Sequence, residues 1–282
     1  MRLIRTREVM REAVAAARAE NLSIGFVPTM GAFHDGHLAL MREAQRRSGF
    51  VVVSLFVNPL QFNDPGDLAR YPRDQARDAA AAAEAGVDVL FAPDASELYP
   101  PDFQTAVIVE GLSEPLEGVF RGRDHFRGVA TVVAKLLNIV RPDYAFFGQK
   151  DAQQALVVRR MARDLDFEAE IVICPTVREP DGLAMSSRNA LLPPGERARA
   201  AALSQALFAV ESAVRSGVRS SESALEAGRA VLRRVAVIPE YFAIVDPATL
   251  QPLEDLRGGL LVVIAAKVGG VRLLDNLPLR LP

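Results

Sequence analysis

The residues best suited to chemistry lie in one stretch, residues 28–37, which reads Pro-Thr-Met-Gly-Ala-Phe-His-Asp-Gly-His. An apolar run over residues 24–27 precedes it, and a segment of helical periodicity over residues 38–47 follows it. A strand that becomes a helix here exposes main-chain N–H groups and the positive end of the helix dipole, and both favour a phosphate group. The glycines allow the main chain to approach a ligand closely, and His34 and His37 can donate hydrogen bonds to phosphate or transfer a proton near neutral pH. The stretch therefore indicates nucleotide binding.

Metal binding is the other interpretation of the His-x-Gly-His spacing. Structural zinc sites use four ligands. Apart from the two histidines of this motif, the chain has one histidine, His125, and one cysteine, Cys174. Neither a Gly-x-x-x-x-Gly-Lys-Ser/Thr loop nor a Gly-x-Gly-x-x-Gly motif occurs to compete as a phosphate site. A phosphate cradle is therefore favoured. Because a helix N-terminus disfavours the imidazolium ion, we expect His37 to be largely neutral.

Two further segments offer groups for phosphate. Residues 147–151, Phe-Gly-Gln-Lys-Asp, again follow a predicted strand and precede a predicted helix, and Lys150 there can reach phosphates. Residues 183–189, Leu-Ala-Met-Ser-Ser-Arg-Asn, supply two hydroxyl groups and a guanidinium. The hypothesis depends on the co-occurrence of these segments, since each alone is a weak signal.

Composition limits the class of protein. With 282 residues, half of them apolar, the chain can bury one large core or a medium and a smaller one. The formal net charge of −2 argues against a nucleic-acid partner. A single cysteine, the lack of an apolar leader and the lack of a run of about 18 apolar residues predict a cytoplasmic protein with no membrane partner.

The order of predicted elements favours an α/β fold with a doubly wound, Rossmann-like parallel sheet and a second, smaller α+β domain. The boundary is expected between residues 175 and 176, where the alternation of strands and helices ends. After it come two predicted helices and then strands, the last two joined by a hairpin at Gly269-Gly270. In the first part, helices are predicted over residues 6–18, 36–47, 73–85, 126–140 and 151–165, and strands over 24–28, 51–57, 87–91, 105–110, 144–147 and 168–174. In the second part, helices are predicted over 194–216 and 221–235, and strands over 241–245, 260–267 and 271–274.

Taken together, the motifs resemble those of the pantothenate synthetase (pantoate–β-alanine ligase) family, within the His-x-Gly-His nucleotidyltransferase superfamily. The motifs occur in the family's order, and the likeness spans essentially the whole chain. They are residues 28–37, Phe-Val-Asn-Pro-Leu-Gln-Phe at 56–62, Tyr-Pro-Arg at 71–73, Phe-Phe-Gly-Gln-Lys-Asp at 146–151, Asp-Gly-Leu-Ala-Met-Ser-Ser-Arg-Asn at 181–189 and Leu-Leu-Asp-Asn at 273–276.

This resemblance implies a two-step reaction that uses ATP, pantoate and β-alanine. Pantoate attacks the α-phosphate to give pantoyl adenylate and pyrophosphate, and β-alanine then displaces AMP to give pantothenate, a precursor of coenzyme A. It also implies a homodimer, Mg²⁺ delivered with ATP, an ATP- and pantoate-binding domain over residues 1–175 and a lid domain over residues 176–282.

The resemblance also implies roles for individual residues. His37 would be the proton donor and His34 its phosphate-binding companion, while Lys150 and Arg188 would oppose negative charge in the transition state. Gln61 would contact pantoate and β-alanine. A second glutamine, Gln154, would contact pantoate. The implied ATP-binding residues are Met30, Gly31, Ala32, Phe33, His34, Asp35, Gly36, His37, Gly148, Gln149, Lys150, Asp151, Val177, Met185, Ser186, Ser187 and Arg188.

Some positions depart from the family pattern. Gln149 stands where many members have glutamate, so a carboxylate is not assumed there. A carboxylate-rich stretch that some relatives use for magnesium matches only at Asp78, so we expect the ion to arrive on the phosphates of ATP. The arginine-rich segment over residues 118–127, with His125, resembles a family segment near pantoate and receives no role.

Other functions are weighed against this one. A nucleotidyltransferase of the same superfamily would release a stable nucleotide-linked product, whereas the ligase frees AMP only when β-alanine is present. A non-catalytic nucleotide sensor would not need His34, His37 and Lys150 together. A tRNA-charging enzyme is disfavoured because the chain has no basic RNA-binding extension.

Overall fold

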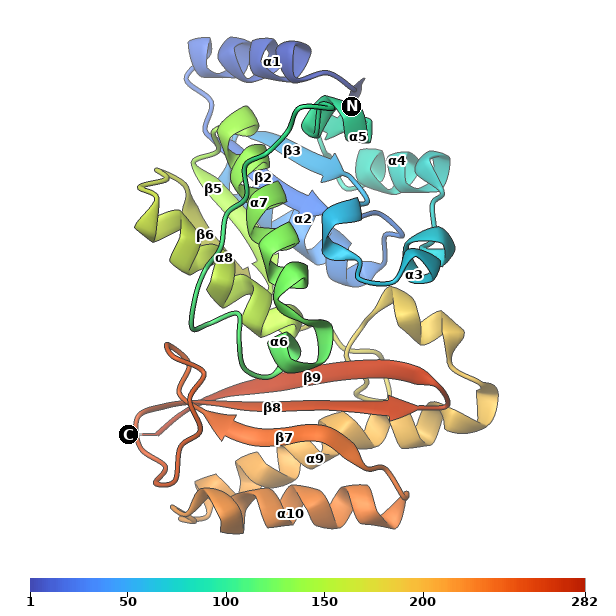
Figure 1. The fold of residues 1–282 in the computed structure, drawn as a ribbon, viewed down its shortest axis with the longest axis vertical. Coiled ribbons are helices and arrows are strands. Elements are labelled where there is room, and N and C mark those ends of the chain that lie inside the picture. The colour runs from blue at the N-terminus through green and yellow to red at the C-terminus, as the bar shows by residue number, and fades with distance from the viewer. Residues whose placement is uncertain (282) are drawn as a thin grey trace. The chain divides into compact units, whose positions relative to one another are not determined.

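The structure is a computed structural model that describes residues 1–281. The chain forms two compact units, of which the first comprises Met1–Gly148 and Gln153–Pro175. The second comprises Gln149–Ala152 and the chain from Thr176 onward. A single boundary along the sequence does not describe this division. The later unit also takes the three residues between β5 (Tyr144–Gly148) and α8 (Ala152–Asp164), both labelled in Figure 1, and the first residue of α8.

The first unit is built on a six-stranded parallel sheet with the order β1-β4-β3-β2-β5-β6, which confirms the predicted doubly wound class. Apolar residues fill its strands because both faces of the sheet are covered. In β2, for example, Phe26 belongs to one buried cluster and the next residue, Val27, belongs to another. The strands are β1 (Arg2–Ile4), β2 (Ile24–Thr29), β3 (Phe50–Leu55), β4 (Val89–Phe91), β5 (Tyr144–Gly148) and β6 (Glu170–Cys174).

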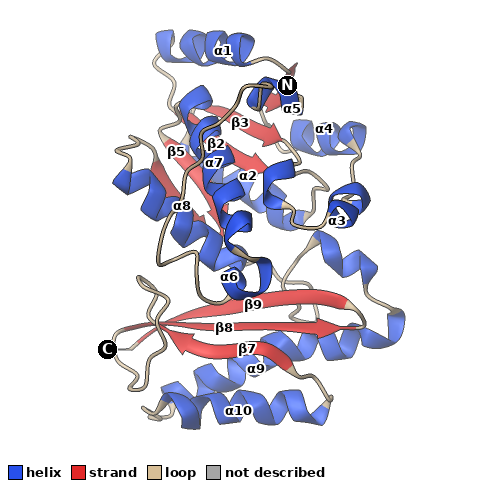
Figure 2. Cartoon of the chain, viewed as in Figure 1, coloured by secondary structure: helices blue, strands red, loops and turns tan. Residues whose placement is uncertain are grey.

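Helices pack in two layers against this sheet (Figure 2). Apolar residues of α1, α7 and α8 join the cluster that contains Phe26, and those of α2 and α4 join the cluster that contains Val27. The helices are α1 (Arg7–Ala19), α2 (Asp35–Arg47), α3 (Pro65–Arg70), α4 (Gln75–Glu84), α5 (Ala95–Leu98), α6 (Glu117–Arg121), α7 (Arg123–Val140) and α8 (Ala152–Asp164), with 3₁₀ turns η1 (Pro59–Gln61) and η2 (Gln149–Asp151).

The strand predicted over residues 105–110 is wrong: this segment is irregular. Its apolar, β-branched residues are typical of a strand, but Val107 and Val109 pack against the core without joining the sheet. The N–H of Val107 donates to Thr131 Oγ1 of α7 at 2.9 Å. A side chain of α7 thus accepts the main-chain hydrogen bond of Val107 that a neighbouring strand would accept if this segment lay in a sheet.

The second unit contains an antiparallel sheet with the order β7-β8-β9, covered by two helices, as predicted. Gly269 and Gly270 form the hairpin turn with φ values of +55° and +81°, which residues with a side chain rarely adopt. The elements are η3 (Ser187–Leu191), η4 (Pro194–Glu196), α9 (Arg197–Arg215), α10 (Ser221–Arg234), β7 (Pro239–Val245), β8 (Gly259–Val268) and β9 (Val271–Arg280).

Within residues 1–281, no helix combines the length and apolar character needed to cross a membrane.

Candidate active site

The histidine turn follows the carboxyl end of β2, at the point where the strand order of the first sheet reverses. Strand β2 pairs with β3 on one side and with β5 on the other, and all three run parallel. Their carboxyl ends therefore lie at one edge of the sheet, where ligands bind in open α/β sheets. Residues 30–34 of the turn connect β2 to α2 at this edge.

A buried carboxylate holds the main chain of the turn. The two oxygens of Asp78, from the first turn of α4, accept hydrogen bonds from the N–H groups of Ala32 (2.9 Å) and Phe33 (2.8 Å). Only 2% of Asp78 is exposed. Gly31 has φ +89°, and a Cβ there would lie 2.6 Å from Leu55 Cδ1 and 2.8 Å from Asp78 Oδ2. The turn thus requires glycine for both conformation and space.

The two histidines cap α2 with their rings 4.2 Å apart. Nδ1 of His34 accepts from the N–H of Gly36 (3.1 Å), and Nδ1 of His37 accepts from the N–H of His34 (3.4 Å). A ring nitrogen that accepts a hydrogen bond carries no proton, so each neutral ring carries its proton on Nε2. Nε2–H is therefore the group that each histidine can offer to a phosphate.

A hydrogen-bonded chain orients Gln61 and joins it to the turn. Asn58 is 1% exposed, and its Nδ2 donates to Gln61 Oε1 and to the Gly128 carbonyl, each at 3.0 Å. Tyr99 donates its hydroxyl to Asn58 Oδ1 (2.9 Å). The Nε2 of Gln61 in turn lies 3.0 Å from Met30 Sδ. The predicted pantoate contact and the predicted ATP segment are thus adjacent within the first unit.

His125, which received no role from the sequence, contacts the main chain of Gln61. Its Nδ1 lies 2.9 Å from the Gln61 carbonyl oxygen, so in the neutral ring the proton sits on Nδ1 to make this hydrogen bond. Helix α7 approaches closely here, since a Cβ on Gly128 would lie 2.3 Å from the Leu60 carbonyl oxygen. The sequence did not indicate that Asn58, Tyr99 and Gly128 support the site. The one local signal was the Asn-Pro pair after β3, which is typical of a turn.

The glutamine pair in α8 divides into two roles. Gln153 is buried and ties down the segment before α6, because it accepts from the N–H of Glu117 and donates to the Leu112 and Pro115 carbonyls. Gln154, the predicted pantoate contact, is half-buried. Because successive residues of a helix point in different directions, the side chain of Gln154 does not share the surroundings of Gln153.

In the second unit, the Lys150 turn is bonded to β9. Asn276 Nδ2 donates to the main-chain carbonyls of Gln149 and Lys150, each at 2.9 Å, and Gln149 Nε2 donates to Asn276 Oδ1 at 2.8 Å. Lys150 Nζ lies 3.2 Å from Asp151 Oδ1. Many family members have a glutamate at this position. In this chain the Gln149 amide acts there as a hydrogen-bond donor.

The neighbouring residue of β9 holds the other predicted phosphate segment. Asp275 forms a two-pronged ion pair with Arg178, with distances of 2.6 and 3.1 Å. Burial raises the pKa of the Asp275 carboxyl above its ordinary value, and the Arg178 guanidinium opposes that rise. The main chain doubles back after Arg178, so that the N–H of Met185 donates to the Val177 carbonyl at 2.9 Å. Ser186 Oγ then accepts from the N–H of Arg188 at 3.3 Å.

The one metal ligand suggested by the sequence, Asp78, is hydrogen-bonded to the main chain. Each oxygen of Asp78 already accepts a main-chain hydrogen bond. In the part of the chain that the structure describes, no group of three or more His, Cys, Asp or Glu residues could hold an ion.

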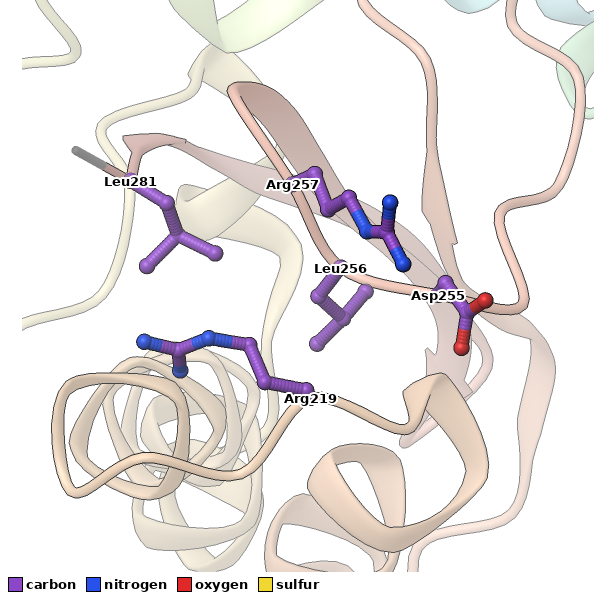
Figure 3. Close-up of a pocket in the computed structure, with 5 residues that line it drawn as sticks. All are labelled: Arg219, Asp255, Leu256, Arg257 and Leu281. Atoms are coloured by element: carbon purple, nitrogen blue, oxygen red, sulfur yellow. The ribbon is translucent and has the colours of Figure 1, made fainter.

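A separate pocket of about 370 Å³ lies in the second unit (Figure 3). None of the predicted site residues lines it. Its lining consists of Arg219, Asp255, Leu256, Arg257 and Leu281.

Comparisons with known proteins agree over nearly the full length. The family model for pantoate-beta-alanine ligase matches residues 2–278. The chain is 51% identical to pantothenate synthetase of Moorella thermoacetica over 283 residues, covering 99% of each chain. It is 50% identical to pantothenate synthetase 1 of Bradyrhizobium diazoefficiens, covering 99% of this chain and 98% of that one.

Solved structures give the same result. Pantothenate synthetase from Thermus thermophilus superposes with a TM-score of 0.93 at 50% identity, covering 98% of this chain and 99% of that one. Pantoate-beta-alanine ligase from Francisella tularensis, complexed with beta-gamma ATP and beta-alanine, superposes with a TM-score of 0.79 at 32% identity, covering 98% and 97%. The chain belongs to the pantoate–β-alanine ligase family.

Proposed function

We propose that this chain condenses pantoate with β-alanine at the expense of ATP, by way of pantoyl adenylate. In the first step a carboxylate oxygen of pantoate bonds to the α-phosphorus, and the bond from that phosphorus to the bridging oxygen breaks to release pyrophosphate. In the second step the amine of β-alanine bonds to the acyl carbon, and AMP leaves with the electrons of the acyl–oxygen bond. The single observation that carries this proposal is the pair of oriented imidazoles in the turn whose Met30 contacts Gln61.

The first unit binds ATP through residues 30–37 and pantoate through Gln61 and Gln154. Each Nε2–H of His34 and His37 donates to phosphate oxygens, whose negative charge grows as pyrophosphate departs, and His37 serves as the proton donor. Because the rings are held by main-chain N–H groups, they need no reorganisation when the charge develops.

The second unit supplies cationic and hydroxyl groups. Lys150 and Arg188 neutralise phosphate charge, and Ser186 and Ser187 add hydrogen-bond donors. Gly148, Gln149, Asp151, Val177 and Met185 complete the proposed ATP contacts. Mg²⁺ enters as part of the ATP substrate, and Asp78 acts on the histidine turn instead of on the ion. The enzyme works as a cytoplasmic homodimer.

The test is product analysis. Incubation with ATP, Mg²⁺ and pantoate should release pyrophosphate up to about one equivalent of enzyme, and AMP should accumulate only after β-alanine is added. Continuous release of a stable adenylylated product without β-alanine would instead identify a nucleotidyltransferase. Absence of pyrophosphate release under both conditions would refute the proposed function.

A further inference from the structure

Adjacent residues of β9, Asp275 and Asn276, hold both segments of the second unit to which the proposed function assigns phosphate contacts. They belong to a sequence motif, Leu-Leu-Asp-Asn, for which neither the fold nor the proposed chemistry has given a purpose. Both side chains are polar and only 3% exposed, in a strand that is otherwise largely apolar on its buried face. Buried polar groups of this kind are retained where their hydrogen bonds specify one arrangement.

The amide of Asn276 bonds to the Lys150 turn through both of its N–H donors and its oxygen. Its two N–H bonds go to the carbonyls of Gln149 and Lys150, and its oxygen accepts from the side chain of Gln149. This segment is four residues long, and its last residue, Ala152, begins α8, the rest of which belongs to the other unit. The three hydrogen bonds thus account for why these few residues belong with the second unit.

The carboxylate of Asp275 acts on the second segment through Arg178. The guanidinium of Arg178 bonds to both oxygens of Asp275 and also to the Gly182 carbonyl at 3.1 Å. Arg178 and Ala184 pair across a short antiparallel bridge, directly before the Met185–Arg188 stretch. Fixing Arg178 therefore fixes the start of the segment that carries Ser186, Ser187 and Arg188.

We infer that Asp275 and Asn276 are positioning residues for the reaction, with Asn276 setting the place of Lys150 and Asp275 setting the place of the Met185–Arg188 segment. This inference rests on the proposed function of those two segments. It assigns each β9 residue to a different segment, so the two effects are separable. Displacing a charged group by about 1 Å can slow a reaction by about 100-fold. Loss of these hydrogen bonds is therefore expected to impair the use of ATP and to leave pantoate binding unchanged.

The experiment compares wild type, Asn276→Asp and Asp275→Asn in the full-length enzyme. Asn276→Asp keeps the shape but replaces both N–H donors with an acceptor that faces two carbonyls. We expect the rate of adenylate formation divided by KM for ATP to fall about 10- to 100-fold, with KM for pantoate within about twofold of wild type. A purely structural role would change both substrates' parameters in parallel or change neither.

Hydrogen exchange without ligands tests the same inference independently of activity. Asn276→Asp should speed exchange in peptides covering residues 149–152 and leave 184–189 unchanged, and Asp275→Asn should do the reverse. Equal exchange in both segments for both variants, with wild-type KM for ATP, would overturn the inference. A wild-type enzyme that forms no adenylate contradicts the proposed function, and the exchange pattern then still decides whether β9 holds these segments.

Gln149→Glu supports the test if a β9 variant fails to fold. It preserves volume and replaces the side-chain NH2 group that donates to Asn276 Oδ1 with a carboxylate oxygen, which repels that oxygen. We expect a fall in the same ATP parameter of about 5-fold or more. Gln251→Glu, at an exposed position of the same unit, is the matched control and should behave as wild type. Gln149→Glu with wild-type ATP kinetics would contradict the role of this hydrogen bond.

Discussion

The two units position their phosphate-binding groups in different ways. In the first unit, the main chain does most of the positioning: parallel strands end at one edge, α2 begins there, and N–H groups of the turn orient both imidazoles. In the second unit, an antiparallel sheet offers no such edge, and buried side chains of β9 hold the segments instead. In a parallel sheet, topology alone brings the strand ends and the turn together, and one buried carboxylate, Asp78, then secures the turn. In the antiparallel sheet, buried polar side chains have to do both.

The largest expected effect is on the first side of this comparison. His37→Ala removes the proposed proton donor, and the rate of pantoyl adenylate formation should fall by about 1000-fold. The fold should survive, because the ring is only half-buried and the buried residues Met41 and Ala44 hold the helix. Pyrophosphate release in a single turnover measures the rate, and thermal unfolding monitors the fold. A first step that runs at the wild-type rate would remove His37 from the mechanism.

The next effect belongs to the second unit. Arg188→Ala removes a guanidinium proposed to stabilise developing phosphate charge, and adenylate formation should slow by about 100-fold. The free energy of unfolding should change by less than about 1 kcal/mol, since Arg188 is half-buried and its main chain is held by Ser186. Arg234→Ala, in the last turn of α10, should leave the rate unchanged. Equal rates in the two variants would show that the second unit does not act on the phosphates.

A smaller effect tests the buried side chain that holds the main chain of the turn in the first unit. Asp78→Ala leaves the N–H groups of Ala32 and Phe33 without their acceptor, so the free energy of unfolding should fall by about 3 kcal/mol and adenylation should slow by about tenfold. Denaturant titration and single-turnover kinetics measure these two quantities. Asp74→Ala removes only the exposed cap of the same helix and should lose about 1 kcal/mol with no change in rate.

The smallest effect concerns the hydrogen-bonded ion pair between Arg7 and Glu97, neither of which belongs to the histidine turn. The N–H and side chain of Arg7 hold the pKa of Glu97 below its ordinary value, against the opposing effect of burial. The stability from this carboxylate is therefore present above the ordinary pKa of about 4.3 and is lost as pH falls through the lowered value in the folded state.

Glu97→Gln should accordingly lower the free energy of unfolding by about 0.5–1 kcal/mol at pH 7, with a smaller difference at low pH. Urea titrations at pH 7 and at about pH 3 measure it. Glu12→Gln, an exposed position on α1, should show no such pH-dependent difference. A difference that grows toward low pH would contradict the sign of the shift.

Much of the fold could be predicted because its signals are local. The continuous apolar run over residues 51–57 indicated a buried parallel strand, which the structure has over residues 50–55. The His-x-Gly-His segment marked the start of α2, and Gly269-Gly270 marked the hairpin. Failure came where a local pattern had no unique meaning. Residues 105–110 have the composition of a strand, yet a hydrogen bond to Thr131 and packing on α7 decided their conformation. The three-residue strand β1 was too short to give any signal.

By itself, the sequence determined the α/β order, the position of the histidine turn and the groups that can meet phosphate, because periodicity, glycines and side-chain chemistry act within a few residues. Only the tertiary structure decided which side chains hold those groups in place. Asp78 is 46 residues from the Ala32 N–H it accepts from, and Asn276 is 126 residues from the Lys150 carbonyl it donates to. No local pattern encodes such pairs, because they form only when the folded core brings the distant segments together and excludes water from between them.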